Sequence, residues 1–253
     1  MSVRPKKHLG QHFLTSAPIA ARIANIFADD APKHILEIGP GTGMLTRELI
    51  KHYPTVNVVE LDEESIAYLK ANALLPDNQI YFGDFLRMPL EDIVQAPTAL
   101  IGNYPYNISS QIVFRLVEYR HLFPLAGGMF QKEVAERIAA PPGSKTYGII
   151  SVWVQAFYDV TYCFTVNEGA FNPPPKVKSG VILLRRRAQS RIQSDPQEFL
   201  KMVKQAFGQR RKMLRGSLKN YSFSENQRML PIFGRRPETL TVEEFDYLLR
   251  LLS

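Results

Sequence analysis

Short apolar runs alternate with amphipathic stretches through the first part of the chain, and this alternation limits the fold more than any other feature. Four of the apolar runs have the length of strands, and they cover residues 34–38, 57–61, 79–82 and 99–101. Stretches with helical periodicity lie between them, among others at residues 45–52 and 65–72. Strands that alternate with helices predict an α/β fold with a mainly parallel sheet and crossover helices.

Three further runs follow before residue 188. Residues 147–157 and 158–166 are rich in β-branched and aromatic side chains, and the second run alternates cleanly. Residues 181–184 form another apolar run, which three arginines close. We expect these runs to be the last strands of the sheet, with an antiparallel hairpin at its edge.

The last quarter of the chain differs from the rest in charge and periodicity. Of the formal net charge of +7, residues 188–253 carry +5, with 12 lysines and arginines against 7 acids. Asp195-Pro196 is typical of a helix start, and Thr241–Glu244 matches a capping box before another helix. We therefore expect two domains, residues 1–187 and 188–253. The positive charge favours a polyanionic partner, either nucleic acid or an anionic membrane surface.

A glycine-rich loop follows the first predicted strand. Gly39, Gly41 and Gly43 allow the backbone to turn tightly and to approach a ligand closely. A dinucleotide fingerprint would need a glycine where Met44 stands, and a P-loop would need a lysine and a hydroxyl residue after the loop. The loop therefore favours a nucleoside ligand that has no pyrophosphate.

Carboxylates stand at the ends of the next two predicted strands. Glu60 lies 21 residues after Gly39, where it can accept hydrogen bonds from ribose hydroxyls, and Asp84 follows the third strand. The carboxyl ends of parallel strands meet at one edge of the sheet, where ligands bind. These residues suit S-adenosylmethionine, whose methyl group is already electrophilic, so the protein needs mainly to position an acceptor. The alternative is a tight turn with two solvated acids.

The segment after the fourth predicted strand has the chemistry of an amine site. The Asn103 amide oxygen and the Pro105 carbonyl oxygen can accept the two hydrogens of an exocyclic amine, which aims its lone pair at the methyl group. Tyr106 offers a flat face for a base, and a base inside a helix would have to be flipped out first. The alternative is a proline turn with a buried tyrosine.

Together these motifs form an ordered set that extends from about residue 4 into the tail. The set consists of Lys6-Lys-His-Leu-Gly-Gln-His12-Phe-Leu14, Glu37-x-Gly-x-Gly-x-Gly43, Glu60, Gly83-Asp84, Asn103-x-Pro-Tyr106, Phe171-x-Pro-x-Pro-x-Val-x-Ser179 and residues 207–218. It resembles the ribosomal RNA adenine N6,N6-dimethyltransferases of the KsgA type. Residues 207–218 resemble the small-subunit enzymes specifically.

The resemblance implies both a fold and a reaction. The fold would be a Rossmann-like S-adenosylmethionine-dependent methyltransferase domain, with a mainly parallel seven-stranded sheet and an antiparallel edge hairpin, followed by a small all-helical C-terminal domain that binds RNA. The reaction would place two methyl groups on each of two adjacent adenines in a hairpin loop near the 3′ end of 16S rRNA. The substrate would be small-subunit rRNA within a pre-30S particle, late in biogenesis, and the enzyme a cytoplasmic monomer.

The resemblance also implies roles for individual residues. The catalytic site would contain Asn103, Pro105, Tyr106 and Phe171, with Phe171 stacking on the target adenine opposite Tyr106. The cofactor would be held by His12, Leu14, Gly39, Gly41, Glu60, Leu61, Asp84, Phe85 and Asn103. His12 stands where Asn is usual in the family, and Tyr104 stands where Leu is usual.

Basic side chains are candidates for contacts with RNA phosphates. Lys176 and Lys178 lie in a segment that three consecutive prolines stiffen. The tail adds the cluster Arg210, Arg211, Lys212 and Arg215. Arg211 and Arg215 are four residues apart, so we expect them on one helical face. The alternative is a solvated charged helix.

Other functions are also compatible with parts of the sequence. A resistance-type dimethylase for large-subunit rRNA would share the catalytic core, and a non-enzymatic assembly or transcription factor could keep the fold and the cofactor site. A nicotinamide dehydrogenase is disfavoured by Met44. Cys163 is the only cysteine, which excludes an intrachain disulfide and a thiolate metal cluster.

The sequence predicts neither a metal nor a membrane partner. The five histidines show no metal-binding spacing. No apolar run reaches the roughly 18 residues of a transmembrane helix. The basic residues at the N-terminus are not followed by the apolar region of a secretory signal.

Overall fold

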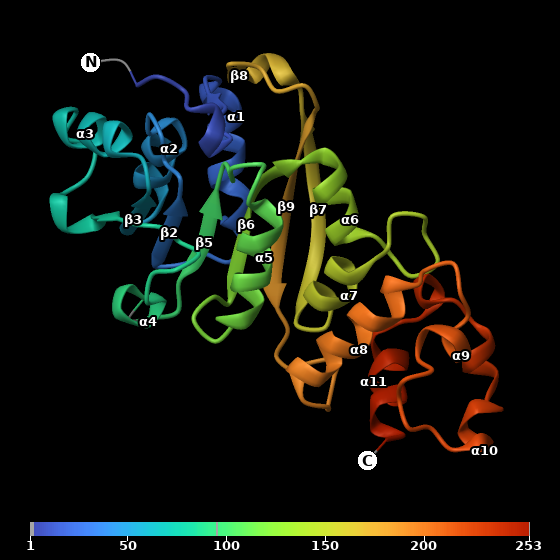
Figure 1. Cartoon of the computed structure of the whole chain (residues 1–253). Coiled ribbons are helices and arrows are strands. Elements are labelled where there is room, and N and C mark those ends of the chain that lie inside the picture. Colours follow the sequence, from blue (N-terminus) through green and yellow to red (C-terminus); the bar gives the residue numbers. More distant parts are fainter. Residues whose placement is uncertain (1–2, 95, 253) are drawn as a thin grey trace. The chain divides into compact units, whose positions relative to one another are not determined.

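The computed structural model describes residues 3–94 and 96–252 (Figure 1). The chain divides into two compact units, and each is described by itself. The first unit consists of the residues up to 135 together with residues 160–186. The second unit consists of residues 136–159 and the residues from 187 onward. The two domains expected at 1–187 and 188–253 stay a prediction.

A seven-stranded sheet forms the centre of the first unit. Its strands, in the order β4-β3-β2-β5-β6-β9-β7, are Ile80–Phe82, Thr55–Glu60, His34–Ile38, Ala99–Gly102, Leu125–Gln131, Ser179–Arg186 and Tyr158–Val166. The neighbours from β4 to β6 pair in parallel, and β9 pairs antiparallel with β6. The predicted mainly parallel sheet, with an antiparallel hairpin of β9 and β7 at its edge, is confirmed.

Helices alternate with the parallel strands along the chain, as predicted. They are α1 (Ala17–Ala24), α2 (Met44–His52), α3 (Glu63–Ala71), α4 (Leu90–Ile93), α5 (Ser109–Glu118) and α6 (Lys132–Ala139). Short 3-10 helices cover Lys7–Leu9, Asn25–Phe27, Asp77–Gln79 and Glu168–Ala170. Ile35 and Leu36 are consecutive in β2 and both are buried. Since consecutive strand residues point to opposite faces, both faces of the sheet are covered.

The expectation of a strand at residues 147–157 was wrong, because this segment forms helix α7 (Ile149–Gln155). Val152, Trp153 and Val154 are all buried in the second unit, and a helix that is apolar all round has no periodicity to reveal it. The Ser151 hydroxyl fixes the start of the helix, since it accepts a hydrogen bond from the Gly148 amide at 3.0 Å. Burial on all sides outweighs the strand preference of these side chains.

The regular structure of the second unit is mainly helical in its described residues, and its two predicted helix starts are confirmed. Its further helices are α8 (Pro196–Gly208), α9 (Leu214–Ser217), α10 (Glu225–Arg228) and α11 (Val242–Arg250), with 3-10 helices at Pro231–Gly234 and Pro237–Thr239. Asp195 caps α8 by accepting hydrogen bonds from the amides of Gln197 and Glu198. Thr241 and Glu244 form the capping box of α11.

Arg211 and Arg215 do not share a helical face, so that expectation was wrong. Helix α8 ends at Gly208, and α9 begins only at Leu214. A turn lies between them, in which the Lys212 amide donates to the Gln209 carbonyl at 2.8 Å. Leu214 is fully buried, and its amide donates to the Arg235 carbonyl, so the chain leaves the helical path to bury this side chain. Among the described residues, no helix is both long and apolar enough to cross a membrane.

Candidate active site

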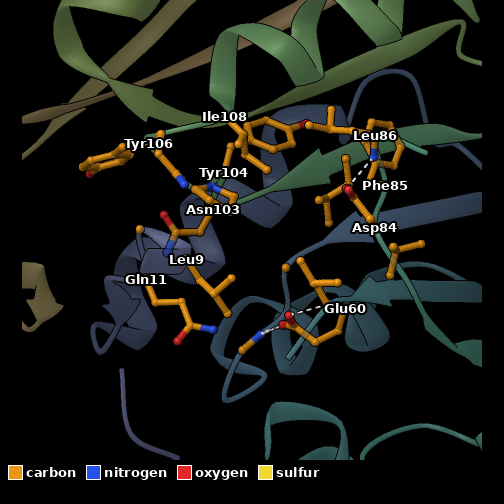
Figure 2. Close-up of a pocket in the computed structure, with 18 of the residues that line it drawn as sticks. Leu9, Gln11, Glu60, Asp84, Phe85, Leu86, Asn103, Tyr104, Tyr106 and Ile108 are labelled. Carbon is orange, nitrogen blue, oxygen red and sulfur yellow. Dashed lines mark hydrogen bonds between the residues drawn. The ribbon is translucent and has the colours of Figure 1, made fainter. Parts of the chain in front are cut away.

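A pocket of about 170 Å³ lies at the carboxyl ends of β2, β3, β4 and β5 (Figure 2). The glycine loop and the residues that follow these strands form most of its walls, and residues 9–13 complete it. Of the residues proposed for the cofactor and the acceptor, those lining this pocket are His12, Gly39, Gly41, Glu60, Leu61, Asp84, Phe85, Asn103, Pro105 and Tyr106. Four strand ends that are far apart in sequence therefore contribute to one site.

Two glycines of the loop are required by their surroundings. Gly41 has a φ angle of 53°, and a Cβ atom on it would lie 2.7 Å from the Phe13 ring. Gly43 has a φ angle of 74°, and a Cβ atom there would lie 2.3 Å from the Leu74 side chain. Both angles belong to the left-handed region that favours glycine. The loop can therefore keep its path along the pocket only with glycine at these positions.

Glu60 ends β3 and presents a carboxylate that is only 6% exposed. Its Oε1 accepts hydrogen bonds from the amides of Leu61 at 2.8 Å and Asp62 at 2.9 Å, and its Oε2 accepts one from the Gly41 amide at 3.1 Å. Burial raises the pKa of Glu60, and these amide donors only partly offset that effect. Three of about four acceptor directions are used, so one on Oε2 remains for a ligand hydroxyl.

The end of β4 contributes an acidic and an aromatic side chain. The Asp84 Oδ1 atom accepts a hydrogen bond from the Leu86 amide at 2.9 Å, which fixes the carboxylate at the pocket wall. Phe85 is buried against the same pocket. By contrast, Leu61 is 47% exposed and lies at the pocket wall after β3. Figure 2 shows Asp84, Phe85 and Glu60 around the same space.

Residues 6–12, which we call the N-terminal strap, are fixed against the pocket by a contact that the sequence analysis missed. The Lys6 ammonium lies 2.5 Å from Oδ1 of Asp62, and the Gln11 side-chain amide donates to Oδ2 at 3.2 Å. Burial alone would raise the pKa of Asp62, but the hydrogen bonds from Lys6, Gln11 and Ser65 lower it. The motif residues were visible in the sequence, but no signal pointed to a contact across 56 positions.

Asn103 has a defined orientation at the carboxyl end of β5. Its side-chain Nδ2 donates to the His12 carbonyl oxygen at 2.8 Å. The amide oxygen Oδ1 is therefore the end that remains available as an acceptor. Tyr104, the next residue, is 2% exposed, and its hydroxyl donates to the Gly127 carbonyl at 2.8 Å. The unusual tyrosine at this position is thus held within the sheet core.

Tyr106 is fixed by two side chains from distant parts of the chain. Its hydroxyl forms a hydrogen bond with the Ser179 hydroxyl at 2.5 Å. Its ring lies beside the His12 imidazole, with 5.4 Å between the ring centroids and 30° between the planes. The His12 Nδ1 atom is 2.8 Å from the Pro173 carbonyl oxygen. The structure thus brings Tyr106 and His12 together at the pocket.

Phe171 and Leu14 are not among the residues that line this pocket, although Leu14 lines a small neighbouring cavity together with Gly39 and Asn103. Phe171 and Leu14 are register partners in a two-stranded antiparallel ribbon of β1 (Phe13–Leu14) and β8 (Phe171–Asn172). Both side chains are buried in the core cluster of the first unit. The ring beside Tyr106 is therefore that of His12, and the stacking of Phe171 on a base stays a prediction.

The six basic residues considered for RNA are exposed. Lys176 and Lys178 lie between β8 and β9 in the first unit, whereas Arg210, Arg211, Lys212 and Arg215 lie in the second unit. Arg210 also donates to the Lys145 carbonyl at 2.7 Å. In the described part of the chain, no cluster of three or more His, Cys, Asp or Glu side chains could hold a metal ion.

The strand order, the glycine loop and the acids at the following strand ends define a Rossmann-like methyltransferase that uses S-adenosylmethionine. More narrowly, the chain belongs to the family described as "Ribosomal RNA adenine dimethylase", whose model matches residues 3–240.

Relatives and solved structures agree with this family. The "Ribosomal RNA small subunit methyltransferase A" of Cytophaga hutchinsonii is 50% identical over 99% of this chain and 98% of its own length. The protein of the same description from Porphyromonas gingivalis is 46% identical over 100% of this chain and 99% of its own. A crystal structure of a dimethyladenosine transferase from Plasmodium falciparum superposes with a TM-score of 0.78 and 29% identity, covering 95% of this chain and 96% of that one. The 23S rRNA methyltransferase ErmE gives a TM-score of 0.69 at 25% identity, covering 95% and 98%.

Proposed function

We propose that this protein transfers methyl groups from S-adenosylmethionine to N6 of two adjacent adenines, two groups to each, in a hairpin loop near the 3′ end of small-subunit rRNA. The names of its relatives support the class of RNA. The observation that carries the chemistry is the orientation of Asn103, because its Nδ2 is bound by the His12 carbonyl and its Oδ1 is left as an acceptor at the pocket.

The residues of the pocket fit the cofactor. The buried Glu60 carboxylate keeps one acceptor direction for a ribose hydroxyl, and a buried acceptor that lacks a partner is costly, so a ligand hydroxyl is favoured there. The rest of the cofactor would be held by Gly39, Gly41, Leu61, Asp84, Phe85, His12 and Leu14. Of these residues, Leu14 would contribute from the buried core. When bound, S-adenosylmethionine supplies an electrophilic methyl group.

The acceptor amine would lie against Asn103 and Pro105. Oδ1 of Asn103 and the carbonyl oxygen of Pro105 accept its two hydrogens, which holds the nitrogen lone pair towards the methyl group. Tyr106 supplies a face for the adenine, which must leave any helical stack to reach it. A base can meet Phe171 only after the residues that now bury this ring have moved.

The RNA contacts of the proposal rest on exposed positive charge. Phosphates of the rRNA within a pre-30S particle would be bound by Lys176, Lys178, Arg210, Arg211, Lys212 and Arg215. We further propose that the enzyme acts as a monomer in the cytoplasm, late in small-subunit biogenesis.

A transfer assay tests the proposal against its main alternative. Unmethylated small subunits and, separately, large subunits are incubated with the protein and methyl-labelled S-adenosylmethionine. We expect label in the rRNA of the small subunit only. Label in large-subunit rRNA would support the resistance-type reaction instead, and cofactor binding without transfer to either would support a non-enzymatic assembly factor.

A further inference from the structure

Ser179 is the last residue of the proline-rich motif, and the sequence analysis gave it no role. Its hydroxyl forms a hydrogen bond with the Tyr106 hydroxyl, with 2.5 Å between the two oxygen atoms. The two residues are 73 positions apart. Tyr106 lies in the loop between β5 and α5, whereas Ser179 is the first residue of β9. A loop residue is thus tied to a strand of the central sheet.

The position of Ser179 is rigid. It is fully buried and is the register partner of Gln131 in β6. The neighbouring backbone adds a hydrogen bond of 2.9 Å from the Lys132 amide to the Lys178 carbonyl. Packing beside it is so close that a Cβ atom on Gly180 would lie 2.8 Å from Ala135 and from the Tyr162 hydroxyl. The Ser179 hydroxyl therefore has a fixed position in the structure.

The remaining contacts of Tyr106 do not fix the orientation of its ring, which therefore depends on the hydrogen bond to Ser179. The Ser109 hydroxyl donates to the Tyr106 backbone carbonyl at 3.2 Å, which fixes the main chain but not the ring. The His12 imidazole lies along the ring at a tilt. Burial raises the pKa of Tyr106, so its hydroxyl stays protonated and can pair with Ser179 over the physiological range.

We propose that Ser179 is a positioning residue for methyl transfer, which holds the Tyr106 ring at the angle on which the target adenine stacks. The inference rests on the proposed function, because it takes Tyr106 as the stacking face. A hydroxyl hydrogen bond fixes the far end of the ring, and small displacements of a reacting group cost much rate, with about 1 Å costing about a hundredfold. Ser179 itself does not touch the base.

A double-mutant cycle tests the proposal through single-turnover transfer at saturating cofactor and saturating small subunits. Ser179→Ala and Tyr106→Phe each remove one hydroxyl of the pair. We expect each to slow transfer by about tenfold, with cofactor affinity unchanged. Since both variants break the same bond, the double variant should be no slower than Tyr106→Phe alone. Additive losses would show that Ser179 acts only through packing and would overturn the proposal.

Two further variants keep the test decisive. Tyr53→Phe is a matched control, because its buried hydroxyl donates to the Ala24 carbonyl at 2.7 Å and the residue does not line the pocket, and it should transfer at the parental rate. If Ser179→Ala does not fold, Tyr106→Phe alone still tests the proposal, because transfer at the parental rate in Tyr106→Phe would contradict it. A parent protein that transfers no methyl group would instead refute the proposed function.

Discussion

The side-chain Nδ2 of Asn103 lies 2.8 Å from the carbonyl oxygen of His12. This hydrogen bond joins the carboxyl end of β5 to the N-terminal strap, across 91 positions of the sequence. Because an amide nitrogen cannot accept, the bond fixes which end of Asn103 presents an acceptor to the pocket. The unusual histidine does not disturb this arrangement, since its backbone and not its ring makes the contact.

Asn103→Ala should therefore slow the chemical step. Without Oδ1 the amine loses one of its two acceptors, and we expect single-turnover transfer at saturating cofactor to fall about a hundredfold. Asn72→Ala is a matched control, because that amide caps the exposed end of α3 by donating to the Tyr68 carbonyl. An Asn103→Ala rate near that of the control would remove Asn103 from the reaction.

Glu60→Ala should weaken cofactor binding. A hydrogen bond to a charged group contributes about 1.5–3 kcal/mol, so calorimetry should show affinity for S-adenosylmethionine reduced by roughly tenfold or more. Glu91→Ala, which changes an exposed glutamate on α4, should bind as the parent does. Equal affinities in the two variants would exclude Glu60 from the cofactor site.

Glu37 should make the stability of the fold depend on pH. Its carboxyl is fully buried behind the glycine loop and accepts a 2.6 Å hydrogen bond from Thr46. Burial has the largest effect and raises the pKa of Glu37 to about 8. The Thr46 hydrogen bond acts in the opposite direction and lowers this pKa, and the nearby charge of Glu60 adds a smaller increase. Between pH 4.5, the ordinary pKa of a glutamate, and about pH 8, the folded protein thus keeps a proton that the unfolded chain has released.

The free energy of unfolding should consequently fall as pH rises through this window. The slope for one proton is at most about 1.4 kcal/mol per pH unit. Denaturant titrations from pH 5 to 9 should show this fall in the parent and a flatter profile in Glu37→Gln, which cannot ionise. Parallel profiles for the two proteins would mean that Glu37 keeps no proton in the fold.

Arg211→Ala/Arg215→Ala should reduce the salt dependence of binding to small subunits. The two side chains lie on different elements, in the turn after α8 and in α9, but both are exposed. Each lost phosphate contact lowers the magnitude of the log–log salt slope by somewhat under 1, so the double variant should lose roughly 1–2. Lys201→Ala on α8 is the control and should keep the parental salt slope. Cofactor affinity should not change in the double variant. Parallel lines of equal intercept for parent and double variant would show that these arginines face only water.

The parts of the fold that depend on local pattern were predicted well. The run at residues 34–38 coincides with β2, and the capping box at Thr241 begins α11 as expected. The run at residues 147–157 contains helix α7, which the sequence could not reveal because a continuous apolar run carries no period; burial on all sides decided its structure. The cations at 211 and 215 were separated because Leu214 turns inward, which charge spacing cannot reveal.

In the site, the strand-end residues could be predicted because parallel strands bring their carboxyl ends together. Glu60 and Asn103 both line the pocket for that reason. The contacts that fix other parts of the pocket could not be predicted, since Lys6–Asp62 and Tyr106–Ser179 join segments whose approach depends on the packing of the whole unit. The same packing buries Phe171 in the core, and its side chain does not line the pocket that its motif suggested.

The central claim is tested most directly by the chemical identity of the modified base. Small subunits that lack the modification are incubated with the protein and S-adenosylmethionine, and the 3′-terminal fragment of their rRNA is analysed by mass spectrometry. The account predicts N6,N6-dimethyladenosine at two adjacent positions of one hairpin loop. When the Asn103→Ala variant is incubated for the same short time as the parent protein, no N6,N6-dimethyladenosine should be detected. Methylation at another atom or base, or modification confined to large-subunit rRNA, would contradict it.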